Sequence, residues 1–323
     1  MTAPRLGLLF PGQGSQYPQM ARDLLRCPAG PALLAEAEDV SGLPLTAVMS
    51  TADASTLADP AIAQLSVLVH SLALADQLAA QGIVPDLVAG HSLGEYTAMV
   101  VAGMLDRATA LSLVVRRGRA MAAAARSRPG AMGAVVGLQA DRVQRMCDAA
   151  DGPVVLANLN SARQLVVSGS PAAVADVLAA ARAAGALRAK PLPVGGAYHS
   201  PLMAPAASTM TDAWAGVVLA PPLCTFVSSA SGAVVTDPGA QALAMRAQLS
   251  APVRWAATMA TVSAAGVAAL VEVGPGRVLA GLAREQAPDL PQLVLREGLP
   301  LSWPPGPGRA AGSDDVLTAA VAG

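Results

Sequence analysis

The feature that most constrains the fold is a glycine-flanked serine placed directly after a short apolar segment. Residues 84–89 form a run typical of a buried strand, and they lead straight into Gly-His-Ser-Leu-Gly at residues 90–94. Side chains at the two flanking glycine positions would collide with neighbouring backbone, so the motif predicts a tight turn. Helical periodicity resumes after it. The pattern therefore predicts a strand, a sharp turn and a helix.

Ser92, at the centre of this turn, is the candidate nucleophile. The turn lifts its Oγ clear of the sheet, and the N-terminus of the following helix offers unpaired N–H groups that favour a developing oxyanion. We expect the N–H of Leu93 to be one oxyanion donor and the glycine-rich loop 12–14, after an apolar strand at residues 6–10, to supply the other. The alternative is an ordinary turn with a capping serine, but the strand–turn–helix context favours a nucleophile.

A serine nucleophile needs a base, and the chain has three histidines. His70 lies within an apolar helical pattern at residues 61–80, which is typical of a packed or surface residue. His91 adjoins Ser92, but its place in the turn directs its side chain away from the serine Oγ. His199 lies in a loop, where functional residues often collect. Elimination leaves His199 as the base.

Two polar residues stand on apolar helix faces. Arg117 shares a face with Val114 and Met121. It is either a surface residue whose stem is covered or a buried cation that awaits an anion, and a buried guanidinium can hold a carboxylate through two parallel hydrogen bonds. Gln64 also lies on an apolar face and needs a partner. For each residue a structural and a functional interpretation remain open.

The hydrophobic pattern changes after a break near residue 129 and indicates a second, smaller domain. Strands and helices are expected in the order βαββαβ, at residues 131–138, 141–150, 154–159, 164–168, 172–184 and 187–194. This order is the ferredoxin-like arrangement. We predict an inserted small domain at 128–195, a large catalytic domain made of 1–127 and 196–298, and a loose C-terminal tail at 299–323 that has little to pack.

Composition excludes several classes of protein. Apolar residues make up 53% of the 323-residue chain, which allows a sizeable core, while 13% charged residues and a net charge of -1 leave no electrostatic footprint for nucleic acid. The three cysteines form no CxxC pair, so we expect no metal site, no disulfide framework and a reduced, cytoplasmic location. The first apolar run is too short for a signal peptide, and no segment is expected to span a membrane.

Six motifs stand in order between residues 6 and 284: Phe10-Pro11-Gly12-Gln13-Gly14-Ser15-Gln16, Gly90-His91-Ser92-Leu93-Gly94-Glu95-Tyr96, Arg117-Gly118, Asn158-Leu159-Asn160-Ser161, His199-Ser200-Pro201-Leu202-Met203 and Glu272-Val273-Gly274-Pro275-Gly276. With these motifs the chain resembles malonyl-CoA:acyl-carrier-protein transacylases and the related acyltransferase domains of polyketide synthases. The resemblance implies an α/β-hydrolase-like large domain with an inserted ferredoxin-like small domain.

The resemblance also implies a catalytic arrangement. Ser92 would form the acyl-enzyme, with His199 as its base. A backbone carbonyl that maps to Gln248 would orient the imidazole, so that no acidic triad member is needed. The N–H groups of Gln13 and Leu93 would form the oxyanion hole. Malonyl-CoA would be the substrate and acyl carrier protein the partner, in fatty acid or polyketide synthesis and without a cofactor.

Further residues are expected to bind the acyl group. The resemblance pairs Arg117 with the malonyl carboxylate and places Gln64 and Asn160 in the lining of the site, and we count His91 with them. The family usually has proline after the glutamine that Gln64 matches, whereas leucine follows here. Tyr198 stands where malonyl-specific members often have phenylalanine, and its bulk is expected to exclude a 2-methyl branch.

Three alternatives remain from the sequence. The chain could be the malonyl-transferring subunit of malonate decarboxylase, with the same chemistry and another carrier. It could be an acyl hydrolase, although a hydrolase has no use for a carboxylate-binding arginine. Asp106, Asp141 and Asp176 fall between Ser92 and His199, so the order of a hydrolase triad does not exclude this class. The third alternative is a non-catalytic docking protein, against which the full set of site residues argues.

Overall fold

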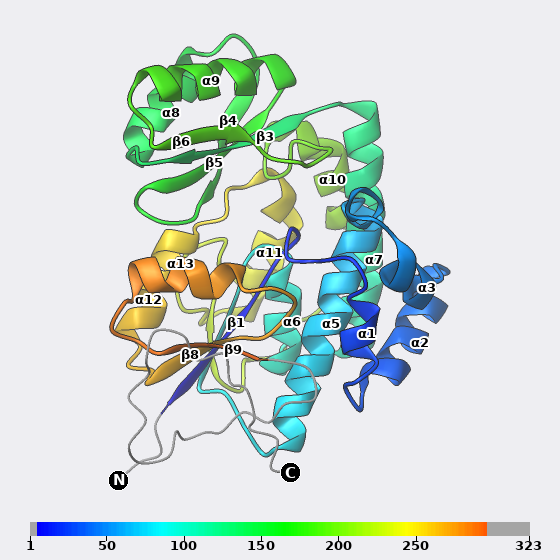
Figure 1. Ribbon diagram of the computed structural model, residues 1–323. Helices are drawn as coiled ribbons and strands as arrows, with labels where there is room; N and C mark the ends of the chain where they lie inside the picture. The colour runs from blue at the N-terminus through cyan, green and yellow to red at the C-terminus, as the bar shows by residue number, and fades with distance from the viewer. Residues whose placement is uncertain (1–4, 296–323) are drawn as a thin grey trace, which may run out of the picture.

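The larger of two sheets is parallel and lies at the centre of the fold. The computed structural model describes residues 5–295 (Figure 1). Its five strands are hydrogen-bonded in the order β7-β2-β1-β8-β9 and all run parallel. They are β1 (Leu6–Phe10), β2 (Leu87–Gly90), β7 (Thr225–Val227), β8 (Ala269–Glu272) and β9 (Gln292–Val294). Because the strands are parallel, the loops that follow β1 and β2 emerge at the same edge of the sheet.

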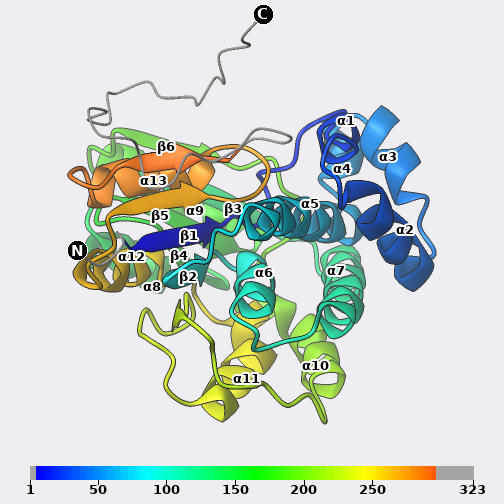
Figure 2. The ribbon, with the colours of Figure 1, turned by 90° about the horizontal axis from the view of Figure 1, so that it is seen from below.

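Both faces of this sheet are buried, which explains its continuous apolar strands. Alternation along β1 sends Leu8 and Phe10 into one hydrophobic core and Leu9 into another. In Figure 2 helices α5 and α12 lie on opposite sides of β1. Helices α6 (Gly94–Val101), α12 (Trp255–Ala264) and α13 (Val278–Gln286) contact strands of the large sheet. Helices α5 (Pro60–Ala80) and α7 (Arg107–Ser127) pack on each other and on α6.

Shorter helices complete the large domain. Asp59 begins α5 by accepting a hydrogen bond from the Ala61 N–H, and Asp106 begins α7 through the Thr109 N–H. The remaining helices are α1 (Ala21–Leu24), α2 (Gly30–Ser41), α3 (Leu45–Thr51), α4 (Ala54–Leu57), α10 (Ala204–Ala213), α11 (Pro238–Ala247) and the 3₁₀ turns η1 (Pro201–Met203) and η2 (Gln248–Ser250). Helix η2 places Gln248 at the end of α11, next to the site described below.

The second sheet is antiparallel and has its own core. It is built from β3 (Ala131–Val136), α8 (Ala140–Ala149), β4 (Val154–Leu159), β5 (Gln164–Gly169), α9 (Pro171–Ala183) and β6 (Arg188–Pro191). The strand order β4-β5-β3-β6 is that of a ferredoxin-like βαββαβ unit, so the predicted fold class is confirmed. Figure 1 shows this unit above the large sheet, with β1 running toward it.

Several sequence expectations differ from the structure. The strands predicted at 131–138 and 187–194 are shorter, as β3 (Ala131–Val136) and β6 (Arg188–Pro191). The strand predicted at 84–89 is β2, Leu87–Gly90, because the Val84 side chain is exposed in the preceding loop. Helix α5 is long and apolar enough, by length and composition alone, to cross a membrane, although no such segment was expected from the sequence. Of its most apolar stretch, 78% is buried inside the fold. The tail predicted at 299–323 lies outside residues 5–295.

Candidate active site

The turn at Ser92 is as tight as its glycines indicate. Ser92 has φ 53°, in the left-handed region that side-chain-bearing residues rarely adopt. A Cβ on Gly94 would lie 2.0 Å from the backbone oxygen of Phe10, and one on Gly90 would lie 2.1 Å from the backbone of Gly94. The end of β1 therefore touches the turn directly. Glycine at both positions is what allows the serine to stand at the edge of the sheet.

His199 lies against Ser92. Its Nε2 is 2.8 Å from Ser92 Oγ, although the two residues are 107 positions apart. On the other side of the ring, Nδ1 lies 3.0 Å from the backbone oxygen of Gln248 and 2.9 Å from that of Ala251. Because carbonyl oxygens only accept, Nδ1 carries the proton, and Nε2 is left to accept the serine hydroxyl proton. The second carbonyl, from Ala251, was not predicted from the sequence.

The environment of His199 keeps its imidazole neutral. Burial lowers the pKa of His199 to about 4, and the nearby positive charge of Arg117 acts in the same direction. At neutral pH the ring is therefore an unprotonated acceptor for the serine proton.

Arg117 is a buried cation without a carboxylate partner in the described part of the chain. It is 1% exposed on α7, and burial lowers its pKa. Its Nη1 donates to Gln64 Oε1, and its Nη2 donates to Gln248 Oε1 at 3.0 Å and to Ser92 Oγ at 3.1 Å. A buried charge held only by neutral groups is poorly compensated. An anionic group beside Ser92 would compensate it.

Gln13 and Leu93 stand where the oxyanion donors were predicted. Gln13 follows β1, and its side-chain Oε1 accepts a hydrogen bond of 2.8 Å from Gln64 Nε2. Gly12 lies so close to the serine turn that a Cβ there would be 2.6 Å from the His91 oxygen. Within residues 5–295, the backbone N–H groups of Gln13 and Leu93 have no hydrogen-bond partner. Both remain available to an acyl oxygen.

The remaining predicted residues surround this centre. His91 Nε2 lies 2.9 Å from Asn160 Oδ1, so the ring is engaged with the small domain and not with Ser92 Oγ. Asn160 is buried in the loop after β4, so the small domain contributes to the site. Tyr198 is buried next to His199, and burial raises the pKa of its phenol to about 12, so it is a neutral wall residue.

Sequence reasoning missed two contributors, the side chain of Gln248 and Glu95. Gln248 Nε2 donates to the Ser92 backbone oxygen at 3.0 Å and to Glu95 Oε2 at 2.8 Å. Glu95 is fully buried, although it belongs to the first turn of an apolar helix. A carboxylate in such a place is unusual, and that signal in the sequence could have identified Glu95.

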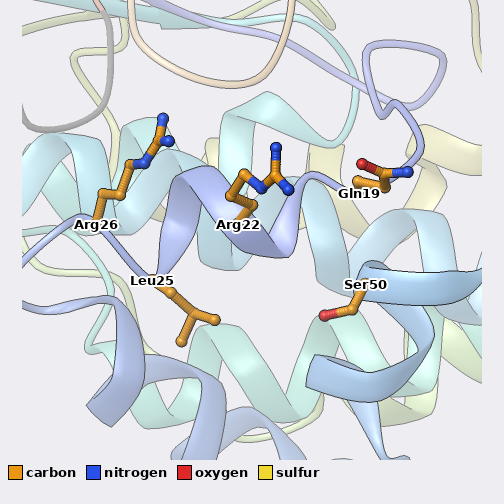
Figure 3. Close-up of a pocket in the computed structure, with 5 residues that line it drawn as sticks. All are labelled: Gln19, Arg22, Leu25, Arg26 and Ser50. Carbon is orange, nitrogen blue, oxygen red and sulfur yellow. The ribbon is translucent and has the colours of Figure 1, made fainter.

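Other polar features lie away from this centre. A pocket of about 640 Å³ lies beside α1 and α3. Figure 3 shows five residues that line it, Gln19, Arg22, Leu25, Arg26 and Ser50. None of these residues belongs to the predicted site. Within residues 5–295 there is no group of three or more histidine, cysteine, aspartate or glutamate residues that could hold a metal ion.

Comparison with known proteins shows which family the chain belongs to. Residues 8–289 match the family model described as acyl transferase domain. The chain is 38% identical over 297 residues to malonyl CoA-acyl carrier protein transacylase of Escherichia coli K12, covering 91% of this chain and 96% of that one. It is 36% identical over 285 residues to the protein of the same name from Bacillus subtilis, covering 87% and 90%.

Solved structures give the same result. The malonyl CoA-acyl carrier protein transacylase of Coxiella burnetii has a TM-score of 0.86 at 33% identity, with 91% of this chain and 94% of that one covered. A malonyl-transacylase solved in complex with a type II polyketide synthase acyl-carrier protein has a TM-score of 0.85 at 35% identity, with 91% and 96% covered. The chain belongs to the acyl transferase domain family and, within it, to the malonyl-CoA:acyl-carrier-protein transacylases.

Proposed function

We propose that the protein transfers a malonyl group from coenzyme A to the phosphopantetheine thiol of an acyl carrier protein through an ester on Ser92. The observation that carries this proposal is the meeting of three groups at one oxygen. Ser92 Oγ lies 2.8 Å from the base His199 and 3.1 Å from the buried cation Arg117. A nucleophile, a base and a receptor for a carboxylate are what malonyl transfer needs.

In the first half-reaction His199 Nε2 takes the hydroxyl proton while Ser92 Oγ attacks the thioester carbonyl carbon. The carbonyl oxygen becomes an oxyanion, for which the N–H groups of Gln13 and Leu93 are free. Collapse of the tetrahedral intermediate breaks the carbon–sulfur bond. The coenzyme A thiolate leaves and receives the proton from His199.

The second half-reaction reverses these roles. His199 Nε2 takes the proton of the carrier thiol, and the sulfur attacks the ester carbonyl on Ser92. The ester carbon–oxygen bond breaks, and the proton returns to Ser92 Oγ. The protein ends unchanged, so the reaction needs no cofactor, only the two thiol substrates.

Acyl selection follows from the groups around the ester. Arg117 would bind the malonyl carboxylate, with Gln64 and Asn160 in the lining. The buried Tyr198 would leave little room for a 2-methyl branch. The proposal extends to fatty acid or polyketide synthesis in the cytoplasm as the setting of the reaction.

The geometry favours transfer over a hydrolase with an acidic triad. Backbone carbonyls, not a carboxylate, hold His199 Nδ1. Two of the aspartates that the sequence left open are engaged elsewhere: Asp106 accepts from the Thr109 N–H at the start of α7, and Asp141 pairs with Arg145 on exposed α8. The close relatives likewise favour an acyl carrier protein over the malonate decarboxylase alternative.

Carrier dependence tests this proposal. Release of free coenzyme A from malonyl-CoA is measured with and without a phosphopantetheinylated acyl carrier protein, and the carrier is analysed by mass. The proposal predicts rapid release only with the carrier, together with a malonyl mass gain on it. Equal release without the carrier and an unmodified carrier would identify a hydrolase instead.

A further inference from the structure

Gln248 contacts the nucleophile, the base and the buried arginine at once. Its backbone oxygen accepts from His199 Nδ1 at 3.0 Å. Its side-chain Oε1 accepts from Arg117 Nη2 at 3.0 Å, and its Nε2 donates to the Ser92 backbone oxygen at 3.0 Å. The orientation of this one side-chain amide therefore bears on where the guanidinium lies relative to Ser92.

Glu95 determines which way that amide faces. Gln248 Nε2 donates to Glu95 Oε2 at 2.8 Å, while Gln248 Oε1 accepts from Arg117. A carboxylate only accepts and a guanidinium only donates. Turning the amide by 180° would oppose two acceptors at Glu95 and two donors at Arg117. These two residues thus select a single orientation for the amide between them.

The surroundings of Glu95 favour an acceptor. Its side chain is fully buried, which raises its pKa, but the hydrogen bonds it receives oppose that effect. Ser228 Oγ donates to Glu95 Oε1 at 2.8 Å, and the Ser229 N–H donates to the same oxygen at 2.5 Å. With the bond from Gln248, three donors converge on one carboxylate. Such a set stabilises the ionised form.

In its ionised form Glu95 also places a negative charge near Arg117. Burial lowers the pKa of the Arg117 guanidinium, and the charge of Glu95 is among the effects that oppose this. The carboxylate does not pair with the guanidinium directly, because Gln248 stands between them. The N–H groups of Arg117 on the side of Ser92 are thereby left for another anion.

We propose that Glu95 is a positioning residue for acyl-group selection: through the Gln248 side-chain amide it holds the Arg117 guanidinium beside Ser92, where a malonyl carboxylate is received. This inference rests on the proposed function. The base depends less on Glu95, because His199 Nδ1 is held by backbone carbonyls and not by the amide that Glu95 orients.

The variant Glu95→Gln tests the proposal with almost no change in size. Ser228 and Ser229 both donate to Oε1, so the new amide keeps its oxygen there and turns its NH₂ toward Gln248. The Gln248 amide must then rotate and present its own NH₂ to Arg117. We expect the ratio of kcat/KM for malonyl-CoA to that for acetyl-CoA to fall about tenfold to 100-fold, the effect of one hydrogen bond to a charged group.

Glu272→Gln is the matched control. Like Glu95, Glu272 is a buried glutamate, but it lies at the end of β8. Its Oε2 accepts a hydrogen bond of 2.8 Å from the Ala280 N–H. It has no hydrogen bond to Arg117, Gln248 or Ser92 within residues 5–295. This variant should leave the selectivity ratio unchanged even if it lowers the melting temperature.

A double-mutant cycle shows whether Glu95 acts through Gln248. Gln248→Met removes the amide but keeps the backbone carbonyl, and it should lower the ratio about as much as Glu95→Gln. The double variant should lower it no further. The proposal is overturned if Gln248→Met leaves the ratio unchanged. This test remains valid even if Glu95→Gln does not fold.

Two further outcomes also overturn it: additive effects of the two substitutions, or equal losses for malonyl-CoA and acetyl-CoA in Glu95→Gln. The proposed function fails in a different way, since the wild-type protein would then transfer no malonyl group at all.

Discussion

Arg117 Nη2 lies 3.1 Å from Ser92 Oγ, so the buried guanidinium contacts the nucleophilic oxygen itself. His199 Nε2 reaches the same oxygen at 2.8 Å. A positive charge at this distance favours negative charge on the serine oxygen as its proton leaves. Under the proposed function the same guanidinium would face the acyl group after acylation. Activation of the serine and choice of the acyl group would then both depend on this one side chain.

Arg117→Ala should remove malonyl selectivity. Truncating one partner of a buried, hydrogen-bonded charge pair costs about 2–5 kcal/mol, which is roughly 30- to 5,000-fold in kcat/KM. We expect this loss for malonyl-CoA, with acetyl-CoA much less affected, because an uncompensated buried cation has been removed. Steady-state kinetics with both substrates measure the effect.

Two variants serve as controls for this prediction. Arg117→Lys should recover only part of the rate, because an ammonium cannot form the two-pronged contact with a carboxylate. Arg116→Ala, at an exposed position of the same helix, should behave as wild type. Equal losses for malonyl and acetyl substrates in Arg117→Ala would mean that the arginine serves activation of Ser92 or the fold, and not the choice of the acyl group.

The pH dependence of kcat/KM should report the lowered pKa of His199. Its pKa falls from the ordinary 6.5 to about 4 in the folded protein, so the base stays neutral as the pH drops below 6.5. Activity toward malonyl-CoA should hold through pH 6 and decline only near pH 4. In Arg117→Ala the decline should begin at higher pH, because a repelling charge is gone. A wild-type decline centred at 6.5 would contradict the burial of this ring.

The free energy of unfolding should also depend on the protonation of His199. The unfolded chain binds a proton at His199 between pH 6.5 and about 4, whereas the folded protein does not. The stabilisation that comes from the neutral, buried imidazole is therefore fully present above pH 6.5, and it is lost as the pH falls from 6.5 to about 4. Urea unfolding of wild type and His199→Ala between pH 6.5 and about 4 should show that the free energy of unfolding falls more steeply with acid in wild type. Parallel plots of this free energy against pH for the two proteins would contradict the prediction.

Substitutions at His70 and at His199 should separate an effect on stability from an effect on catalysis. His70 is fully buried in α5 and packs edge-on against Tyr17, with 6.4 Å between the ring centroids. His70→Ala should lower the melting temperature but leave kcat near wild type. His199→Ala should lower kcat about 100- to 10,000-fold, the usual contribution of a general base. A large loss of kcat in a folded His70→Ala protein would contradict this assignment.

The turn at Ser92 predicts a contrast between two glycines. In Gly94→Ala the new Cβ would meet the Phe10 backbone oxygen at 2.0 Å, so β1 or the turn must shift. We expect a loss of about 1–3 kcal/mol in the free energy of unfolding, together with most of the activity. Gly281→Ala in α13 meets nothing within 4 Å and should raise stability by about 0.5–1 kcal/mol. Similar stabilities in urea unfolding would refute the close approach.

The local hydrophobic pattern was enough to predict many elements of the large domain and the order of strands and helices in the small domain. The apolar run 6–10 is β1, and the periodic segment 61–80 is α5, Pro60–Ala80, because burial on one or two faces leaves a direct trace in the sequence. The strand–turn–helix around Ser92 follows from glycine sterics, which are equally local.

Long-range hydrogen bonds could not be predicted in this way. The Ala251 carbonyl at His199 depends on how η2 ends, and the Gln248 side chain bonds Ser92, which lies 156 positions away in the chain. The resemblance pointed to the Gln248 backbone carbonyl, but nothing in local periodicity shows that the side chain would turn toward Glu95. That arrangement exists only once α6, α7 and η2 are packed together.

The central claim is that Ser92 carries the acyl group, and intact-mass analysis after brief incubation with malonyl-CoA tests it most directly. Wild-type protein should gain the mass of one malonyl group and lose it again when a phosphopantetheinylated acyl carrier protein is added. Ser92→Ala should gain nothing. A Ser92→Ala protein that still gains one malonyl group would place the acyl group on another residue and contradict the account.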